Sequence, residues 1–294
     1  MAEFRYQVVD VFTSTPLEGN ALAVFPDASG IDDATMQRVA REMNLSETTF
    51  VLPRESAGDA TRVRIFTPAR ELPFAGHPTI GTAYVMRLLG IVPAGAKRFV
   101  LDENVGGVPI RVDDGDDPIL WLTTPPITKL GDFPADACAR ALSLSSERLA
   151  AGVPCEQLSA GSPLIFVAVK DRAAVDDAEV DSAAFAALMR ESKAPSPIFV
   201  FAATERGAYS RMFAPVLGIV EDPATGGATG PLAAFMMAHG LVARADGTRF
   251  VSEQGVKMGR RSLLHVLVHG EHGEDGIEVG GNVVPVASGT MRLP

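Results

Sequence analysis

Hydrophobic and polar residues alternate in short runs along most of this chain, which has 294 residues. The first run, residues 4–12, alternates at every second position, as a half-buried strand does. Other runs are rich in apolar and β-branched residues and are bounded by turn residues, so they also predict strands. They cover residues 21–25, 49–52, 62–66, 99–101, 108–112, 120–122, 164–169, 198–202, 209–213, 250–252, 262–269, 276–279 and 281–288.

Helical spacing is confined to a few segments. Residues 32–43 place apolar side chains on one face, from Met36 to Met43, and Asp32 is a suitable N-cap. A second helix is predicted over residues 79–89 and ends at Gly90. Because strands dominate and connections are short, the sequence predicts an α+β fold of curled, mostly antiparallel or mixed sheets, each around a central helix. Shorter helical pieces are predicted at residues 136–142, 146–149 and 181–189.

Two segments of the chain repeat one another. Residues 64–90 read RIFTPARELPFAGHPTIGTAYVMRLLG, and residues 211–240 read RMFAPVLGIVEDPATGGATGPLAAFMMAHG. Arg-x-Phe-x-Pro opens both, and later positions match at a shift of 150 residues; upstream, the pair Phe50-Val51 matches Phe199-Val200. We therefore predict two pseudo-symmetric halves, residues 1–117 and 118–281, with a last strand, about residues 282–294, that pairs back onto the first half.

Each repeat predicts a strand, a glycine turn and the start of a helix. The first N–H groups of a helix have no acceptor within the helix, and the helix dipole adds partial positive charge, so an anion can bind there. Gly76 and Gly226 lie at these turns and allow close approach of a ligand to the backbone. If the halves pack by approximate two-fold symmetry, both helix starts face one cleft, which is a common place for a small ligand.

The net charge of the chain limits the classes of molecule that it is expected to bind. The net charge is −10 and the pI about 5, which disfavours nucleic acid and acidic membranes but permits a small anionic substrate. The two cysteines, Cys138 and Cys155, lie outside the glycine turns and are expected to be reduced, as in the cytoplasm; a disulfide is the minor alternative. The first ten residues predict a strand rather than a signal peptide, and no apolar run is long enough to span a membrane.

Two residues of the first half are candidates for acid–base chemistry. Glu47 lies between a predicted helix and a predicted strand, and its local sequence favours a solvated turn. Apolar neighbours leave open a buried carboxyl, whose pKa would rise above about 4.3. His77 follows Gly76 at an exposed helix start, where a structural role has less support than proton transfer or hydrogen bonding.

The remaining polar candidates give weaker signals. Asp222 precedes Pro223, so a turn aspartate and a carboxylate that orients His77 or a substrate amine are equally supported. Asn20 is either a left-handed turn residue or an amide that donates to a substrate. The set His265, His269 and His272 has spacing that suggests a metal, but no carboxylate or cysteine completes it, so no metal site is predicted.

Four motifs resemble the PhzF-like phenazine biosynthesis isomerase family. The resemblance implies the fold of diaminopimelate epimerase and proline racemase, a cofactor-free isomerase that is often a homodimer, and no metal. It also implies that Glu47 takes a proton from one carbon and returns it to another, with help from His77 and Asp222. The motifs are residues 19–25 (GNALAVF), 44–51 (NLSETTFV), 66–79 (FTPARELPFAGHPT) and 221–226 (EDPATG).

The chain departs from its relatives at two places. Epimerases and racemases of this fold use one cysteine in each glycine turn, where this chain has Ala75 and Pro223. PhzF-like proteins commonly have serine where this chain has Gly227. The resulting hypothesis is a proton-shifting isomerase of a small carboxylate, with a racemase, epimerase or dehydratase and an inactive ligand-binding protein as alternatives. The predicted substrate-binding residues are Asn20, Gly76, Thr225, Gly226 and Gly227.

Overall fold

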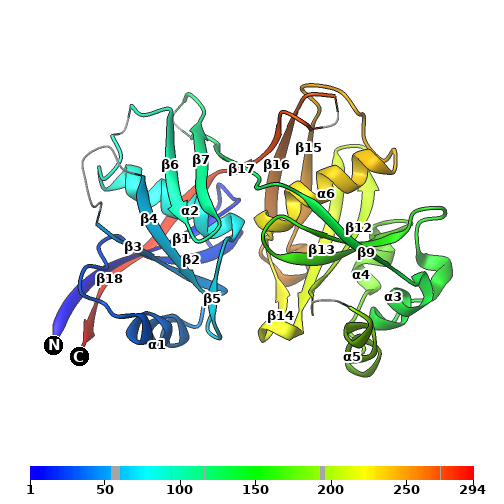
Figure 1. Ribbon diagram of the computed structural model, residues 1–294, viewed down its shortest axis with the longest axis horizontal. Coiled ribbons are helices and arrows are strands. Elements are labelled where there is room, and N and C mark those ends of the chain that lie inside the picture. Colours follow the sequence, from blue (N-terminus) through cyan, green and yellow to red (C-terminus); the bar gives the residue numbers. More distant parts are fainter. Residues whose placement is uncertain (54–59, 94, 116, 193–195, 272) are drawn as a thin grey trace. The chain divides into compact units, whose positions relative to one another are not determined.

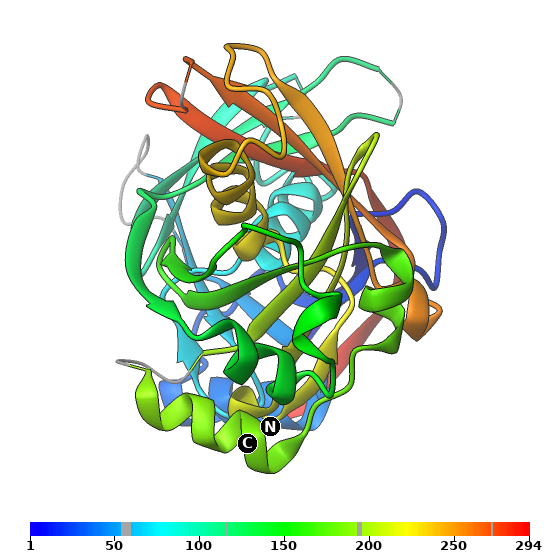
Figure 2. The same ribbon diagram turned by 90° about the vertical axis from the view of Figure 1, so that its right-hand side faces the viewer.

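The computed structural model describes residues 1–53, 60–93, 95–115, 117–192, 196–271 and 273–294 (Figures 1 and 2). The chain divides into two compact units. Unit 1 comprises residues 1–125 and 278–294, and unit 2 comprises residues 126–277. The predicted α+β class, with mixed sheets and few helices, is confirmed.

Unit 1 is a mixed sheet in the order β18-β1-β2-β3-β4-β6-β7-β8-β17. The pairs β2–β3 and β4–β6 are parallel and the others antiparallel; β5 adds a short pairing to β4. The strand β18 pairs with β1 along almost its whole length. The strands are β1 (Ala2–Val11), β2 (Asn20–Phe25), β3 (Glu47–Val51), β4 (Thr61–Phe66), β5 (Glu71–Leu72), β6 (Arg98–Glu103), β7 (Gly106–Val112), β8 (Leu120–Thr123), β17 (Gly276–Gly281) and β18 (Val283–Leu293).

Two helices cover the two faces of this sheet. Helix α2 (Gly76–Leu88) is buried along most of its length and contacts β1, β2, β3, β8 and β18 (Figure 1). It packs so closely that a Cβ atom at Gly81 would lie 2.6 Å from a methyl carbon of Leu22 and 2.8 Å from one of Val11. Helix α1 (Asp33–Met43) packs its apolar stripe on the opposite face, against the aromatic rings of Phe25 and Phe50.

Unit 2 repeats this plan in the order β9-β10-β11-β12-β13-β15-β16, with β14 beside β13. Helix α6 (Gly226–Ala238) packs on one face, and α3, α4 and α5 pack on the other. The other elements are β9 (Thr128–Phe133), α3 (Ala135–Ala141), β10 (Cys155–Ser159), β11 (Pro163–Val169), α4 (Arg172–Asp177), α5 (Ser182–Glu191), β12 (Ile198–Thr204), β13 (Gly207–Ala214), β14 (Ile219–Asp222), β15 (Arg249–Gln254), β16 (Ser262–His269) and 3₁₀ turns at Ser146–Arg148, Pro215–Leu217 and Val256–Met258.

Strand pairing shows that the repeat in the sequence is a repeat in the fold. In unit 1, β4 and β6 are parallel, with Arg62 opposite Asp102; in unit 2, β13 and β15 are parallel, with Tyr209 opposite Glu253. One sequence match was off by one residue. Phe50 pairs with Arg64 and Val200 pairs with Arg211, so Phe50 corresponds to Val200 rather than to Phe199.

Several predicted boundaries were wrong. Helix α2 begins at Gly76, not at residue 79, because Pro78 lies in the first turn, where its missing N–H leaves no helical bond unmade. Strands β9 and β10 and helix α4 had not been predicted.

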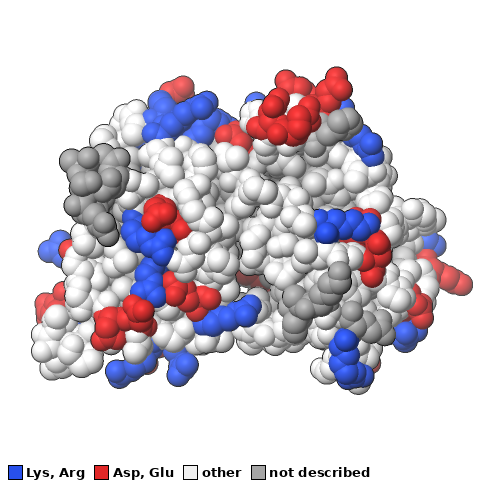
Figure 3. All heavy atoms as spheres, viewed as in Figure 1, with Lys and Arg blue, Asp and Glu red and all other residues white. Residues whose placement is uncertain are grey.

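The surface carries charges of both signs. Acidic and basic side chains are interspersed on the face drawn in Figure 3. Within the described ranges, no helix is long and apolar enough to cross a membrane.

Candidate active site

The carboxyl of Glu47 and the imidazole of His77 meet inside unit 1. Glu47 is the first residue of β3 and is 9% exposed, and His77 is the second residue of α2 and is 4% exposed. Oε2 of Glu47 lies 3.3 Å from Nε2 of His77. The local sequence had favoured a solvated turn for Glu47, but parallel pairing with Leu22 on β2 and contact between β3 and α2 bury it.

Asn20 determines which nitrogen of His77 carries the proton. Its amide nitrogen lies 3.1 Å from Nδ1 of His77. An amide nitrogen only donates, so Nδ1 accepts and the ring proton is on Nε2, which faces Glu47. Burial lowers the pKa of His77 to about 3, so the ring is neutral at physiological pH. The contact is therefore a close approach of a neutral ring to the Glu47 carboxyl and not an ion pair.

A glycine places Asn20 beside His77. Gly19 has a positive φ of +67°, whereas Asn20 does not; it is the first residue of β2 and is 1% exposed. A Cβ atom on Gly19 would lie 2.4 Å from the carbonyl oxygen of Val11. The reading of Asn20 as a left-handed turn residue is thus wrong, and its side chain belongs to the Glu47–His77 group.

The start of α2 has backbone donors but no side-chain cap. Its N-cap is Ala75, which makes no capping hydrogen bond through its side chain. The N–H groups of Gly76 and His77 belong to the first turn, where helix geometry offers no acceptor. The hydroxyl of Thr79 donates to the carbonyl of Ala75 at 2.8 Å, which ties the turn together.

A second polar group lies at the start of α6 in unit 2. Asp222, 5% exposed, accepts a hydrogen bond of 2.6 Å from the hydroxyl of Thr225. The amide nitrogen of Gln254 donates to the carbonyl of Asp222 at 2.8 Å and to Oγ1 of Thr225 at 2.9 Å, and its oxygen accepts from the N–H of Thr225 at 3.1 Å. Gly226 and Gly227 then open the helix, so two backbone amides without Cβ atoms follow this fixed turn.

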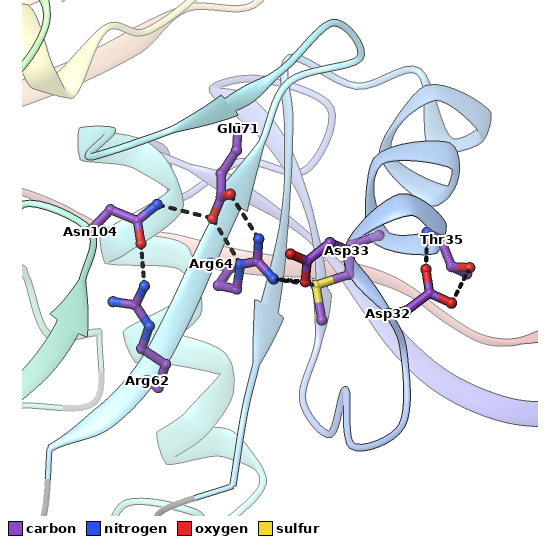
Figure 4. Close-up of polar contacts among 8 residues, drawn as sticks. Asp32, Asp33, Thr35, Arg62, Arg64, Glu71 and Asn104 are labelled. Carbon is purple, nitrogen blue, oxygen red and sulfur yellow. Dashed lines mark hydrogen bonds and ion pairs between the residues drawn. The ribbon is translucent and has the colours of Figure 1, made fainter.

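An arginine supports the strand that enters each glycine turn. In unit 1, Nε and Nη2 of Arg64 donate to the two carboxylate oxygens of Glu71, both at 2.8 Å; Figure 4 shows this pair with its neighbours Asp33, Arg62 and Asn104. In unit 2, Arg211 holds Glu221 through two bonds of 2.9 Å. The repeat therefore preserves a bidentate Arg–Glu pair ahead of each helix start.

The predicted site residues thus form two groups. Asn20, Glu47 and His77 meet in unit 1 next to Gly76, and unit 2 holds the other group, Asp222, Thr225, Gly226 and Gly227. Sequence reasoning missed Gln254 and the buried acid Glu103, although both close the strand that follows each repeat.

The alternative metal and thiol readings find little support. In the part of the chain that the structure describes, no three His, Cys, Asp or Glu side chains cluster as a metal site would require; His272 lies outside the described residues. Cys138 and Cys155 are both buried and reduced in unit 2.

The N-caps of α2 and α6 are Ala75 and Thr225, so Thr225, not Pro223, corresponds to Ala75.

Comparison with known proteins identifies the family of this chain. The family model of phenazine biosynthesis-like proteins matches residues 9–289. The chain is 38% identical to trans-2,3-dihydro-3-hydroxyanthranilate isomerase of Pseudomonas chlororaphis, over 98% of this chain and 99% of that protein.

Solved structures show the same fold. A predicted epimerase from Pseudomonas aeruginosa is 34% identical, with a TM-score of 0.83 over 99% of this chain and 100% of the other. A PhzF-family protein of Bacillus anthracis has a TM-score of 0.89 at 24% identity, and the match covers 100% of both chains. The chain therefore belongs to the PhzF-like phenazine biosynthesis family of isomerases.

Proposed function

We propose that this protein is a cofactor-independent isomerase that moves a proton between two carbons of a small carboxylate, with Glu47 as the acid and base. The observation that carries the proposal is the buried contact of 3.3 Å between Glu47 and a neutral His77 whose tautomer Asn20 sets. A buried carboxyl beside a neutral imidazole is suited to accept and return a proton.

The reaction needs one group that acts twice. The Glu47 carboxylate takes a proton from a C–H bond next to an unsaturated system, and the electron pair of that bond moves into the conjugated system. The resulting carboxylic acid then gives a proton to a second carbon, so substrate and product have the same composition. Exchange of the carboxyl proton with solvent between the two steps brings deuterium into the product in D₂O. His77, whose Nε2 lies 3.3 Å from Glu47, is proposed to orient this carboxyl through both steps. Positioned acid–base catalysis of this kind contributes roughly 10²–10⁴-fold to the rate.

The substrate carboxylate is proposed to bind at helix starts. The uncapped first turn of α2 at Gly76 offers N–H donors and the positive end of a helix dipole. We propose that the start of α6 in unit 2 is also a substrate-binding element, through Asp222, Thr225 and the amides of Gly226 and Gly227. Asp222 is an acceptor and would select a hydroxyl or amino group.

The relatives suggest which compound to test first. Those named trans-2,3-dihydro-3-hydroxyanthranilate isomerase share 38–39% identity with this chain over almost its full length. Gly227 lacks the serine hydroxyl of such relatives, so related cyclic and acyclic carboxylates belong in the same panel. The proposal includes a cytoplasmic homodimer, as the family resemblance implies, which light scattering of the purified protein would test.

The test is incubation of the panel in D₂O with NMR detection of deuterium at carbon. Wild-type protein should give an isomer with deuterium at the new C–H position or at the exchanged one, and Glu47→Gln should give neither while it melts at a similar temperature. Glu42→Gln, which changes an exposed glutamate of α1, is the matched control. Full turnover by Glu47→Gln would refute the role of Glu47.

An epimerase is the second candidate, since the relative at 34% identity is described as a predicted epimerase. Two-cysteine epimerisation is disfavoured because both cysteines of this chain lie elsewhere. A product that differs from its substrate only in configuration at the exchanged carbon would identify this activity.

A further inference from the structure

The hydroxyl of Thr79 has two oxygen neighbours but only one hydrogen. It lies 2.8 Å from the carbonyl oxygen of Ala75 and 2.6 Å from Oε1 of Glu103. A carbonyl oxygen only accepts, so Thr79 donates to Ala75 and the second bond needs a hydrogen from Glu103. A protonated carboxyl supplies it. An ionised carboxylate would instead compete with Ala75 for the one hydroxyl hydrogen.

The surroundings of Glu103 also favour the neutral form. Its side chain is 2% exposed, and Oε2 is buried with no hydrogen-bond partner among the described residues. Burying the neutral carbonyl oxygen of a protonated carboxyl without a hydrogen-bond partner costs less free energy than burying a charged carboxylate oxygen. Desolvation raises the pKa of Glu103 to about 8, against smaller opposing effects of Thr79 and Arg62.

The repeat shows what this position does in the other half. Glu103 closes β6 as Gln254 closes β15, since the parallel pairings Arg62–Asp102 and Tyr209–Glu253 place the two strands in the same register. Gln254, an amide of almost the same shape as a protonated glutamate, fixes the turn into α6 through Asp222 and Thr225. The start of α2 has Ala75 where α6 has Thr225, so Glu103 reaches the helix through Thr79 instead.

We propose that Glu103 is a positioning residue that keeps its proton in the working protein and fixes the first turn of α2, as Gln254 fixes the start of α6. That turn carries Gly76 and His77, so Glu103 acts on the reaction through them. This role rests on the proposed function, but the protonation of Glu103 does not. An ionised Glu103 would pull Thr79 from Ala75 and place negative charge beside a helix start that binds a carboxylate.

Few other charges act on this group. The charges that shift the pKa of Glu103 are Arg62 on β4, which lowers it, and Asp102 on β6, which raises it. Both are partly exposed and lie 3.5 Å apart, so they largely offset each other. On β7, Glu103 pairs with Gly106, which has no charge. The expected pH-dependence therefore reports the protonation of Glu103, whose pKa these neighbours shift only modestly.

The first arm of the test does not need the reaction. The free energy of unfolding is measured by urea denaturation from pH 4.5 to 9 in wild type, Glu103→Gln and the control Asp102→Asn. The pKa of Glu103 is raised in the folded state, so its stabilisation is present below 4.5 and is lost as pH rises through about 8. The folding constant of wild type should fall relative to that of Glu103→Gln by up to about tenfold per pH unit in this range. Asp102→Asn should follow wild type.

The second arm measures kcat/KM against pH with a substrate identified by the deuterium test. Wild type should lose activity above pH 8, mainly through a higher KM, and Glu103→Gln should keep within about threefold of wild-type activity at pH 7 and extend the plateau by at least one pH unit. Thr79→Val should lower activity at all pH values. The proposal would be overturned if kcat/KM of Glu103→Gln fell at high pH as it does in wild type. It would also be overturned if the folding free energies of the two proteins depended on pH in the same way. If no substrate turns over but the folding arm holds, only the proposed function fails.

Discussion

Nε2 of His77 lies 3.3 Å from Oε2 of Glu47, and the ring that makes this contact is uncharged. The pair therefore differs from a histidine–carboxylate ion pair, in which protonation would strengthen the contact. In unit 1 the histidine stays neutral, and the carboxyl is the group left to exchange protons.

The neutral state of His77 predicts how stability depends on pH. Its pKa is about 3 in the folded protein and near 6.5 in the unfolded chain, so below pH 6.5 only the unfolded chain takes up this proton. The contribution of His77 is complete above pH 6.5 and is lost as pH falls towards 3. Between pH 6.5 and 5 the loss should be about 2 kcal/mol. Urea denaturation should show this loss in wild type and not in His77→Gln; equal losses in both would contradict it.

Asn20→Ala should weaken catalysis without unfolding the protein. The change removes the donor to Nδ1 of His77, so the ring loses its fixed tautomer and a buried nitrogen loses its partner. A lost hydrogen bond of this kind costs about 1–3 kcal/mol, so kcat should fall roughly tenfold or more. The control is Asn104→Ala, an exposed amide bonded to Glu71. Unchanged kcat in Asn20→Ala would mean that the tautomer does not matter.

The two Arg–Glu pairs should differ in their effect on stability. The side chains of Arg211 and Glu221 are 9% and 12% exposed, and Arg211 also donates to the carbonyl oxygens of residues 175, 176 and 178. Arg211→Ala leaves a buried charge and three carbonyls without their donor, so it should cost about 3–5 kcal/mol.

Arg64→Ala should cost less. The side chains of Arg64 and Glu71 are 16% and 26% exposed, so water can solvate the remaining carboxylate better. Chemical denaturation of both variants gives the comparison. An equal or larger loss in Arg64→Ala would show that exposure does not set the difference.

Gly81→Ala should destabilise unit 1. The added methyl would meet Leu22 at 2.6 Å and Val11 at 2.8 Å, so α2 would have to move off the sheet, at a cost of about 1–3 kcal/mol. Gly131→Ala is the control, since nothing lies within 4 Å of its Cβ position. The melting temperature should fall in Gly81→Ala only. Because α2 carries His77, kcat should fall as well.

The sequence allowed much of the framework to be predicted, because its signals are local. Helix α1 has the apolar stripe and the Asp32 cap that were expected, with Asp32 accepting from the N–H of Thr35. The repeated glycine turns also identified both helix starts. In contrast, β9 is polar and mostly exposed, and only its pairing with β10 makes it a strand.

The parts of the candidate site that escaped prediction depend on distant contacts. Glu103 resembles a solvated acid at the end of a strand, but it is buried and its carboxyl contacts Thr79, 24 residues earlier. The same holds for Glu47. Its local sequence favours exposure to solvent, and its burial comes from contacts with β2 and α2. Non-local packing of this kind has no period in the sequence.

The pairing of β18 with β1 affects the order in which the two units fold during synthesis. Unit 2 is one unbroken stretch, residues 126–277, so it can finish folding as soon as that stretch has emerged. Until then the edge of β1 that does not pair with β2 stays unpaired, because the strand that pairs with it, β18, is translated after unit 2. The half of the protein that holds Glu47 is therefore begun first and completed second, and a chaperone that shields this strand edge would act during that interval.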